Sequence, residues 1–104
     1  RRERYKFDLH GFTLDEANYK VKEIIEYCLK NKFRELLLIT GKGIHSTNDE
    51  DAYISKNLGK LKYSVPEFIL KNKSLMALIN GIQEARIEDG GSGAFYIFLK
   101  KKKI

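Results

Sequence analysis

The sequence predicts an α/β domain that opens with a βαβ unit. Three features carry this prediction: an alternating apolar pattern near the start, an apolar stripe at helical spacing after it, and then an unbroken apolar run. The chain has 104 residues, of which 42% are apolar and 33% are charged. This size and composition suit one core that needs no metal or disulfide. We therefore expect a single domain over residues 1–104, and because the chain starts without Met, we expect it to be part of a longer protein.

The first strand is expected over Tyr5–Leu9, where apolar and polar residues alternate. Thr13, followed three residues later by Glu16, has the spacing of a helix capping box. Apolar residues then recur every three or four positions, which predicts a helix through about Lys30 that ends at Asn31 in a left-handed conformation. The members of this apolar stripe are Leu14, Ala17, Val21, Ile24, Ile25 and Cys28.

The run Leu36–Ile39 is apolar at every position, which predicts a short strand that is buried on both faces. A strand, a helix and a buried strand form a βαβ unit. Such crossovers are right-handed in nearly all cases, so the two strands should be parallel. Their carboxyl ends then meet at one edge of the sheet, where ligands bind in many α/β proteins.

The second half of the chain is expected to complete the sheet. Residues 44–57 are polar without a clear period, and we expect a surface loop there. Apolar residues at helical spacing predict a helix within Lys60–Leu70, with Pro66 in its first turn. A strand is expected within Leu75–Ile82, opened by a helical turn, and another over Ala94–Leu99.

The charge balance favours a polyanionic partner. Lysine and arginine outnumber aspartate and glutamate by 20 to 14, which gives a net charge of +6. Nucleic acid would be attracted to such a surface, although a basic surface that only keeps a protein soluble has the same composition. The single Cys28 cannot form an internal disulfide, which favours a reducing, cytoplasmic environment. No apolar run is long enough to span a bilayer, so we expect no membrane association.

Asp8 and His10 stand two positions apart at the predicted end of the first strand, just before Gly11. Because side chains alternate along a strand, both are expected on the same face, with Cα atoms about 7 Å apart. A carboxylate can orient a neighbouring imidazole and favour its protonated form, which makes the pair a candidate for acid–base catalysis. The alternative is a polar strand face on which His10 only bonds to backbone.

A second cluster, Thr40, Gly41, Lys42 and Gly43, follows directly after the buried strand. Two glycines around a lysine allow backbone amides to approach a phosphate, and Lys42 supplies positive charge. His45 could extend this surface. The alternative is a tight turn after a strand. The spacing does not match a P-loop, which disfavours nucleotide hydrolysis.

A third cluster of glycines, Gly90, Gly91 and Gly93, opens the last predicted strand. It is either a flexible hairpin turn or a second place where backbone meets a ligand. In the strand itself, Tyr96 and Phe98 alternate with the other apolar residues. One aromatic set of this strand could stack on nucleobases, although core packing is the better interpretation for most of these residues.

Neither a metal site nor a serine nucleophile is expected. The two histidines, the one cysteine and the scattered carboxylates have no spacing typical of zinc or calcium sites. The sequence around Ser92 lacks the G-x-S-x-G pattern of serine hydrolases. We therefore expect no metal and no other cofactor.

Three motifs together, F-D-L-H-G at 7–11, T-G-K-G at 40–43 and G-G-S-G-A at 90–94, resemble the Smr (small MutS-related) domain family in order and spacing. The resemblance extends from about Phe7 to Lys100. It implies a two-layer α/β sandwich in which two main helices cover a mixed four-stranded sheet, similar to the C-terminal domain of a bacterial translation initiation factor. It also implies endonuclease activity, which acts on DNA in some members and on RNA at stalled ribosomes in others.

The resemblance implies that Asp8 and His10 act in catalysis and that Thr40 to Gly43 hold the nucleic acid. Many members have His where this sequence has Thr40, so no catalytic role is carried over to that position. Further candidate contacts to nucleic acid are Gly11, His45, Gly90, Gly91 and Gly93.

Given the nuclease activity that the resemblance implies, the residues favour metal-independent cleavage of RNA, because metal-assisted nicking of DNA usually needs two or more carboxylates and only Asp8 is placed for it. A DNA-nicking endonuclease is an alternative. A module that binds RNA, branched DNA or the ribosome without cutting is another.

Overall fold

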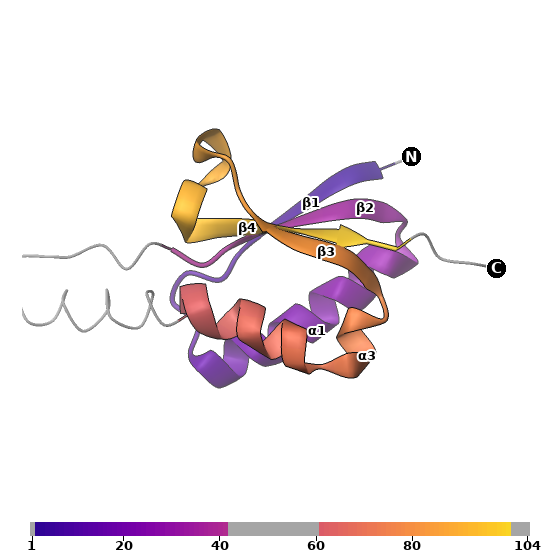
Figure 1. The fold of residues 1–104 in the computed structure, drawn as a ribbon, viewed down its shortest axis with the longest axis horizontal. Coiled ribbons are helices and arrows are strands. Elements are labelled where there is room, and N and C mark those ends of the chain that lie inside the picture. The colour runs from indigo at the N-terminus through magenta and orange to yellow at the C-terminus, as the bar shows by residue number, and fades with distance from the viewer. Residues whose placement is uncertain (1, 42–60, 101–104) are drawn as a thin grey trace, which may run out of the picture.

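The computed structural model describes residues 2–41 and 61–100 of the chain (Figure 1). Four strands form one mixed sheet in the order β1-β2-β4-β3, in which β1 and β2 are parallel and β4 is antiparallel to both of its neighbours. Helices cover one face of this sheet, which confirms the predicted α/β sandwich and its βαβ start. The elements in chain order are β1 (Arg2–Asp8), α1 (Leu14–Lys30), β2 (Phe33–Ile39), a helical segment over residues 61–71, α3 (Lys73–Met76), β3 (Ile79–Glu84), the 3-10 turns η1 (Ile87–Asp89) and η2 (Gly91–Gly93), and β4 (Ala94–Leu99).

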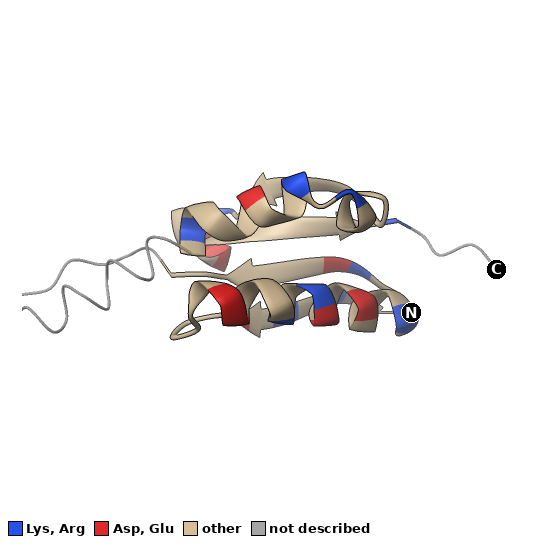
Figure 2. Ribbon diagram, turned by 90° about the horizontal axis from the view of Figure 1, so that it is seen from below, with Lys and Arg blue, Asp and Glu red and all other residues tan. Residues whose placement is uncertain are grey.

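The main core lies between the sheet and the helical layer. Figure 2 shows this layer from its outer side, with α1 and the helical segment 61–71 side by side over the sheet. The predicted stripe of α1 is buried there, except that Leu14 at its start is 39% exposed. Leu36, Leu38 and Ile97 meet the stripe from the sheet and are fully buried. Removal of this apolar surface from water is the main force that holds the two layers together.

The capping box at the start of α1 is confirmed, whereas the predicted end of the helix is wrong in detail. Thr13 Oγ1 accepts a hydrogen bond from Glu16 N at 3.2 Å, and Glu16 Oε1 accepts one from Thr13 N at 3.0 Å. Asn31 is not left-handed: its φ is −98°, and the left-handed residue is Lys32, with φ 64°. The side-chain amide of Asn31 donates to Tyr27 O at 2.8 Å, so the helix ends through a side-chain bond and the chain reverses one residue later.

β2 is buried on both faces, as predicted. Leu36 and Leu38 face the helices, while Leu37 joins a small second cluster on the opposite face with Tyr96. β1 and β2 both begin three residues earlier than predicted, because their parallel pairing already starts at Arg2 and Phe33. β1 also ends one residue earlier, at Asp8.

The helix predicted within Lys60–Leu70 is present over residues 61–71, and the predicted loop over 44–57 lies outside the described residues. Pro66 is not in the first turn of the helix, because residues 61–65 before it are already helical. Burial of apolar side chains on both sides of Pro66, such as Val65 and Ile69, offsets the hydrogen bond that proline cannot donate.

The helical turn expected at Ser74, before the strand predicted within Leu75–Ile82, is confirmed, but the strand itself begins later than predicted. The short helix α3 occupies Lys73–Met76, and Asn72 Oδ1 caps it by accepting from Leu75 N at 3.1 Å. β3 then begins at Ile79. The last strand, Ala94–Leu99, has the bounds that the sequence predicts.

Cys28 is fully buried in the core. Burial raises the pKa of its thiol to about 12, so the thiol stays protonated near neutral pH and serves in packing rather than as a nucleophile. None of the helices in the described ranges is both long enough and apolar enough to cross a membrane.

The connection from β3 to β4 is a hydrogen-bonded turn rather than the flexible one that its glycines suggest. Gly91 N donates to Arg86 O at 2.9 Å, and Gly93 N donates to Gly90 O at 3.0 Å. Gly90 has a φ of +121°, a value that residues with side chains rarely adopt. A Cβ atom at this position would lie 2.7 Å from the Cβ atom of Ala94. The sequence therefore needs glycine here for the backbone to pass β4 closely.

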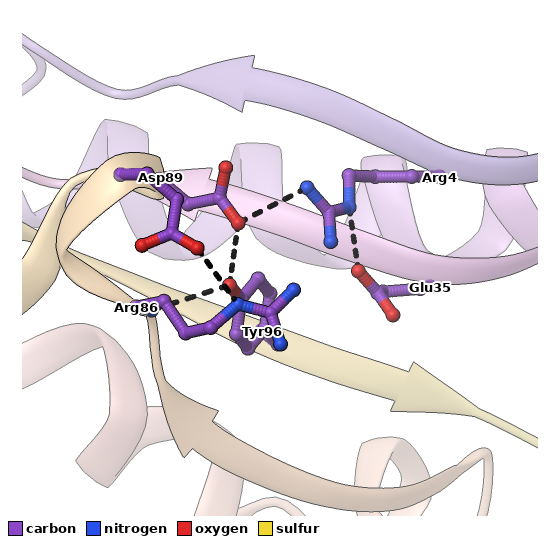
Figure 3. A network of polar contacts seen from close by, with 6 residues as sticks. Arg4, Glu35, Arg86, Asp89 and Tyr96 are labelled. Carbon is purple, nitrogen blue, oxygen red and sulfur yellow. Dashed lines mark hydrogen bonds and ion pairs between the residues drawn. The ribbon is translucent and has the colours of Figure 1, made fainter.

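A polar network on the helix-free face of the sheet holds this connection against β1 and β2 (Figure 3). Tyr96 Oη donates to Asp89 Oδ2 at 2.5 Å, and the same oxygen accepts from Arg4 Nη1 at 3.2 Å. Arg4 Nε also pairs with Glu35 Oε2 at 2.5 Å. The guanidinium groups of Arg4 and Arg86 lie 5.1 and 5.7 Å from the centroid of the Tyr96 ring, which is favourable for cation–π attraction. The network thus covers Tyr96, of which only 3% is exposed.

We expect Asp89→Asn to make stability less dependent on pH. The hydrogen bond from Tyr96, and then the charge of Arg4, hold the pKa of Asp89 below its usual value of 3.8. The ionised carboxylate therefore stabilises the fold above that usual value, and the contribution disappears as pH falls through the lower folded-state pKa. Chemical unfolding from pH 7 to pH 2 should show a stability gap between wild type and variant that closes at acidic pH.

Glu88→Gln is the matched control, because the Glu88 side chain is 71% exposed and only its surface pair with Arg86 is lost. A gap of constant size from pH 7 to pH 2 in Asp89→Asn would contradict a role for the Asp89 charge.

We expect Gly90→Ala to lower the free energy of unfolding by about 1–3 kcal/mol, because it combines an unfavourable φ with a close contact to Ala94. Gly81→Ala is the control: a Cβ atom at Gly81 meets nothing within 4 Å, so its effect should be within about 1 kcal/mol of zero. Urea unfolding of both variants measures the difference. Equal stabilities would show that the turn tolerates a side chain.

Candidate functional site

The sheet topology brings the three sequence motifs to one edge. β1 and β2 are parallel, so Asp8 and Thr40 lie at neighbouring carboxyl ends. β4 is antiparallel to β2, so its amino end, with Gly93, lies at the same edge (Figure 1). The predicted convergence of the first two motifs is therefore confirmed, and the structure adds the third.

Backbone hydrogen bonds connect the three segments directly. Leu9 N donates to Ile39 O at 2.7 Å, which continues the β1–β2 ladder past the end of β1. Thr40 N and Gly41 N both donate to Gly93 O, at 2.8 and 3.0 Å. The three segments therefore keep a fixed spacing at this edge.

Thr40 is fully buried, and its Oγ1 also donates to Gly93 O at 3.2 Å. Its amide and hydroxyl, together with the Gly41 amide, are thus used inside the protein. The structure places Thr40 as a positioning residue, so any phosphate contact in this loop would come from residues after it. Lys42, Gly43 and His45 lie outside the described residues.

Asp8 and His10 lie close together, but the expectation that His10 belongs to the strand is wrong. β1 ends at Asp8, and His10 lies in a turn. Asp8 Oδ1 accepts a hydrogen bond from the backbone amide of His10 at 2.8 Å, so the carboxylate fixes the turn that carries the imidazole. Both residues are exposed, and within the described part of the chain the imidazole has no hydrogen-bond or ion-pair partner. The imidazole is therefore free to meet a ligand.

Gly11 completes this turn with a φ of +87°, and Phe12 N donates to Leu9 O at 3.0 Å. The ring of Phe12 packs edge-on against Phe7, with centroids 6.0 Å apart. The turn thus leads directly into α1. The first turn of α1 is closed by its capping box and carries two acidic residues, so it disfavours phosphate binding at the helix end.

The remaining glycines shape the same edge. Gly41, with a φ of +86°, lets the chain leave β2 in a conformation that side chains disfavour. Gly91 and Gly93 are buried, and Gly90 is half-buried, so these residues offer little backbone to a ligand in this arrangement. Among residues 2–41 and 61–100, no three His, Cys, Asp or Glu side chains are grouped so that they could hold a metal ion.

Arg4, Asp89 and Tyr96 anchor the glycine-rich turn, a role that no pattern in the sequence predicts for them. Arg4 and Tyr96 stand at outward-facing strand positions, and only the strand order brings them together. Of the two interpretations of Tyr96, core packing rather than stacking on nucleobases is confirmed, because Arg4 and Arg86 cover its ring and its hydroxyl is bonded to Asp89. Phe98, its neighbour on this face, is partly buried against the same cluster.

Known structures have the same fold. The chain is similar to the Smr domain of MutS2 from Thermus thermophilus, with a TM-score of 0.70 and 23% identity over 91% of this chain and 96% of that one. It is also similar to YdaL, a stand-alone small MutS-related protein from Escherichia coli, with a TM-score of 0.65 and 23% identity over 92% of this chain and 64% of that one.

Relatives by sequence carry functional names. Endonuclease NBR9 of Saccharomyces cerevisiae is 30% identical over 91% of this chain, and ribosome rescue factor SmrB of Aliivibrio fischeri is 29% identical over 88%. The chain spans 32% and 42% of the lengths of these two relatives. The sequence profile of the Smr domain matches residues 7–100, nearly the whole chain. The chain therefore belongs to the Smr domain family.

Proposed function

We propose that this Smr domain is an RNA endonuclease in which Asp8 and His10 form the catalytic pair. The observation that carries the proposal is the hydrogen bond from His10 N to Asp8 Oδ1, which fixes the turn and leaves the exposed imidazole free. Relatives named as an endonuclease and as a ribosome rescue factor support a nucleic-acid substrate, and the net charge of +6 favours one.

In this mechanism His10 takes the proton from a ribose 2′-hydroxyl. The 2′-oxygen attacks the adjacent phosphorus, the bond to the 5′-oxygen breaks, and that oxygen takes a proton from solvent water as it leaves. The products are a 2′,3′-cyclic phosphate and a 5′-hydroxyl. Asp8 holds the turn through the His10 amide so that the imidazole of His10 meets the 2′-hydroxyl.

Negative charge develops on the phosphate oxygens during this reaction and needs nearby donors. Lys42 directly follows Gly41 in the sequence, and we assign it this role together with the amide of Gly43. The buried Thr40 hydroxyl supports the assignment indirectly, because its bond to Gly93 fixes the point where the chain leaves β2.

We expect His10→Ala to lower RNA cleavage by about 10²–10⁴-fold, the usual contribution of general acid–base catalysis, with little change in stability because His10 is exposed. Asp8→Asn should cost less than Asp8→Ala, because asparagine still offers an oxygen to the His10 amide but removes the charge. Lys22→Ala, an exposed residue on α1, is the control. Cleavage of end-labelled RNA measures the rates, and a fully active His10→Ala protein would rule out the mechanism.

The same assay distinguishes the alternatives. We expect each upstream fragment to end in a 2′,3′-cyclic phosphate, which must be removed before that end can be labelled again. The same amount of product should form with and without EDTA. Nicking of supercoiled DNA that stops in EDTA would favour metal-assisted DNA cleavage instead. Intact RNA that is bound in a salt-dependent way would favour a module that binds without cutting.

A further inference from the structure

β1 leaves one backbone edge unpaired. It lies at the end of the strand order, and β2 is its only neighbour in the sheet of the described residues. Leu9 N donates to Ile39 O, and amides in a parallel ladder alternate in direction, so the N–H and C=O groups of Arg4 and Lys6 face away from β2. An edge of this kind can accept a further strand.

A groove of about 430 Å³ runs beside this edge, between β1 and α1. Its apolar part is formed by Tyr5 and Phe7 from β1 and by Ile24 and Tyr27 from α1. The rings of Tyr5 and Tyr27 are 5.3 Å apart, yet Tyr27 remains 50% exposed. An aromatic residue half in water beside an unpaired strand offers apolar area that a partner can bury.

The groove has the length of a short extended peptide. Its α1 wall extends from Lys20 to Lys30, ten helical steps or about 15 Å. An extended chain covers that length with about four or five residues. Alternate side chains of an added strand would enter the groove, and the others would lie on the helix-free face.

The charges indicate what the added strand contains. Its residues on the helix-free face would lie beside Arg4, which already pairs with Glu35 and Asp89, and beside Lys6, which is exposed and forms no ion pair within the described ranges. An acidic side chain fits beside Lys6 as a cross-strand partner. A second copy of the chain is disfavoured in the registers that place Lys6 of one β1 opposite Lys6 or Arg4 of the other, because these are like charges. Glu23 and Glu26 line the groove together with Lys20 and Lys30, so these four side chains give the groove no net positive charge that would favour the phosphates of a nucleic acid.

We propose that the outer edge of β1 and its groove bind an extended segment of another protein in which apolar and acidic residues alternate. The segment adds to the sheet beside β1 by backbone hydrogen bonds, with its apolar side chains against Tyr5 and Tyr27. This peptide-binding mode is known from other folds in which a groove lies between an edge strand and a helix. The inference does not depend on the nuclease proposal, because it uses the side of β1 rather than the sheet edge with Asp8 and His10.

The probe is a blocked heptapeptide in which Glu alternates with Val and Tyr, titrated into the ¹⁵N-labelled domain and followed by NMR. We expect saturable shifts at the amides of Arg4, Lys6 and Tyr27, and slower hydrogen exchange at Arg4 and Lys6. A peptide of the same composition with all Glu residues at one end should bind at least tenfold more weakly. No shift at millimolar peptide, or shifts that map elsewhere, would overturn the proposal.

Lys6→Pro removes an outward amide without breaking the β1–β2 ladder, and it should weaken binding on the order of tenfold. Lys6→Gln keeps that amide and removes only the charge, so it should weaken binding by about twofold to threefold. If Lys6→Pro does not fold, Tyr27→Ala tests the groove instead and should weaken binding on the order of tenfold.

If the variant that is tested folds and still binds the peptide with wild-type affinity, strand addition is contradicted. Displacement of the peptide by oligouridine would assign the groove to nucleic acid. The same shifts appearing with protein concentration alone would assign it to a second copy.

Discussion

The carbonyl oxygen of Gly93 is the point on which the candidate site depends. It accepts hydrogen bonds from the Thr40 amide, the Thr40 hydroxyl and the Gly41 amide, and it thereby joins the end of β2 to the start of β4. A buried hydroxyl without a partner costs about 1–3 kcal/mol, so the identity of residue 40 and the position of Gly93 constrain each other. The small polar side chain of Thr40 therefore helps to hold the end of β2 against the start of β4 at this edge of the sheet.

The glycine-rich turn is held from a second side by charged residues. Asp89 connects it to Arg4 on β1 and Tyr96 on β4, while Gly93 connects it to β2. Two independent anchors thus stabilise a turn in which two glycines, Gly90 and Gly91, have positive φ. A site that must align a phosphate with an imidazole benefits from such support, because small displacements of a catalytic group cost much of its rate.

Local signals in the sequence predicted much of the fold, and two of the errors lie where another interaction outweighs the local signal. The capping box of Thr13 and Glu16 and the strand Ala94–Leu99 depend on neighbours in the chain, and both are confirmed. Asn31 was expected to be left-handed, but its side chain bonds to the helix instead. Pro66 was expected in a first turn, but apolar burial extends the helix before it.

The sequence predicts where the candidate site lies, at the edge where the first two motifs meet. The hydrogen bond from the His10 amide to Asp8 and the burial of Thr40 depend on the three-dimensional arrangement and could not be predicted. Arg4 and Asp89 are 85 residues apart, and only the strand order makes them neighbours.

The position of β4 has a consequence for how the protein is made. This strand is the last of the four to be synthesised, yet it lies inside the sheet, between β2 and β3. Before its synthesis, β2 and β3 have no bridge to each other, and each leaves a backbone edge unpaired that invites association with other nascent chains. Completion of the sheet thus waits for residues 94–99, and a product truncated before residue 94 would be a target for chaperones and proteases rather than a smaller working domain.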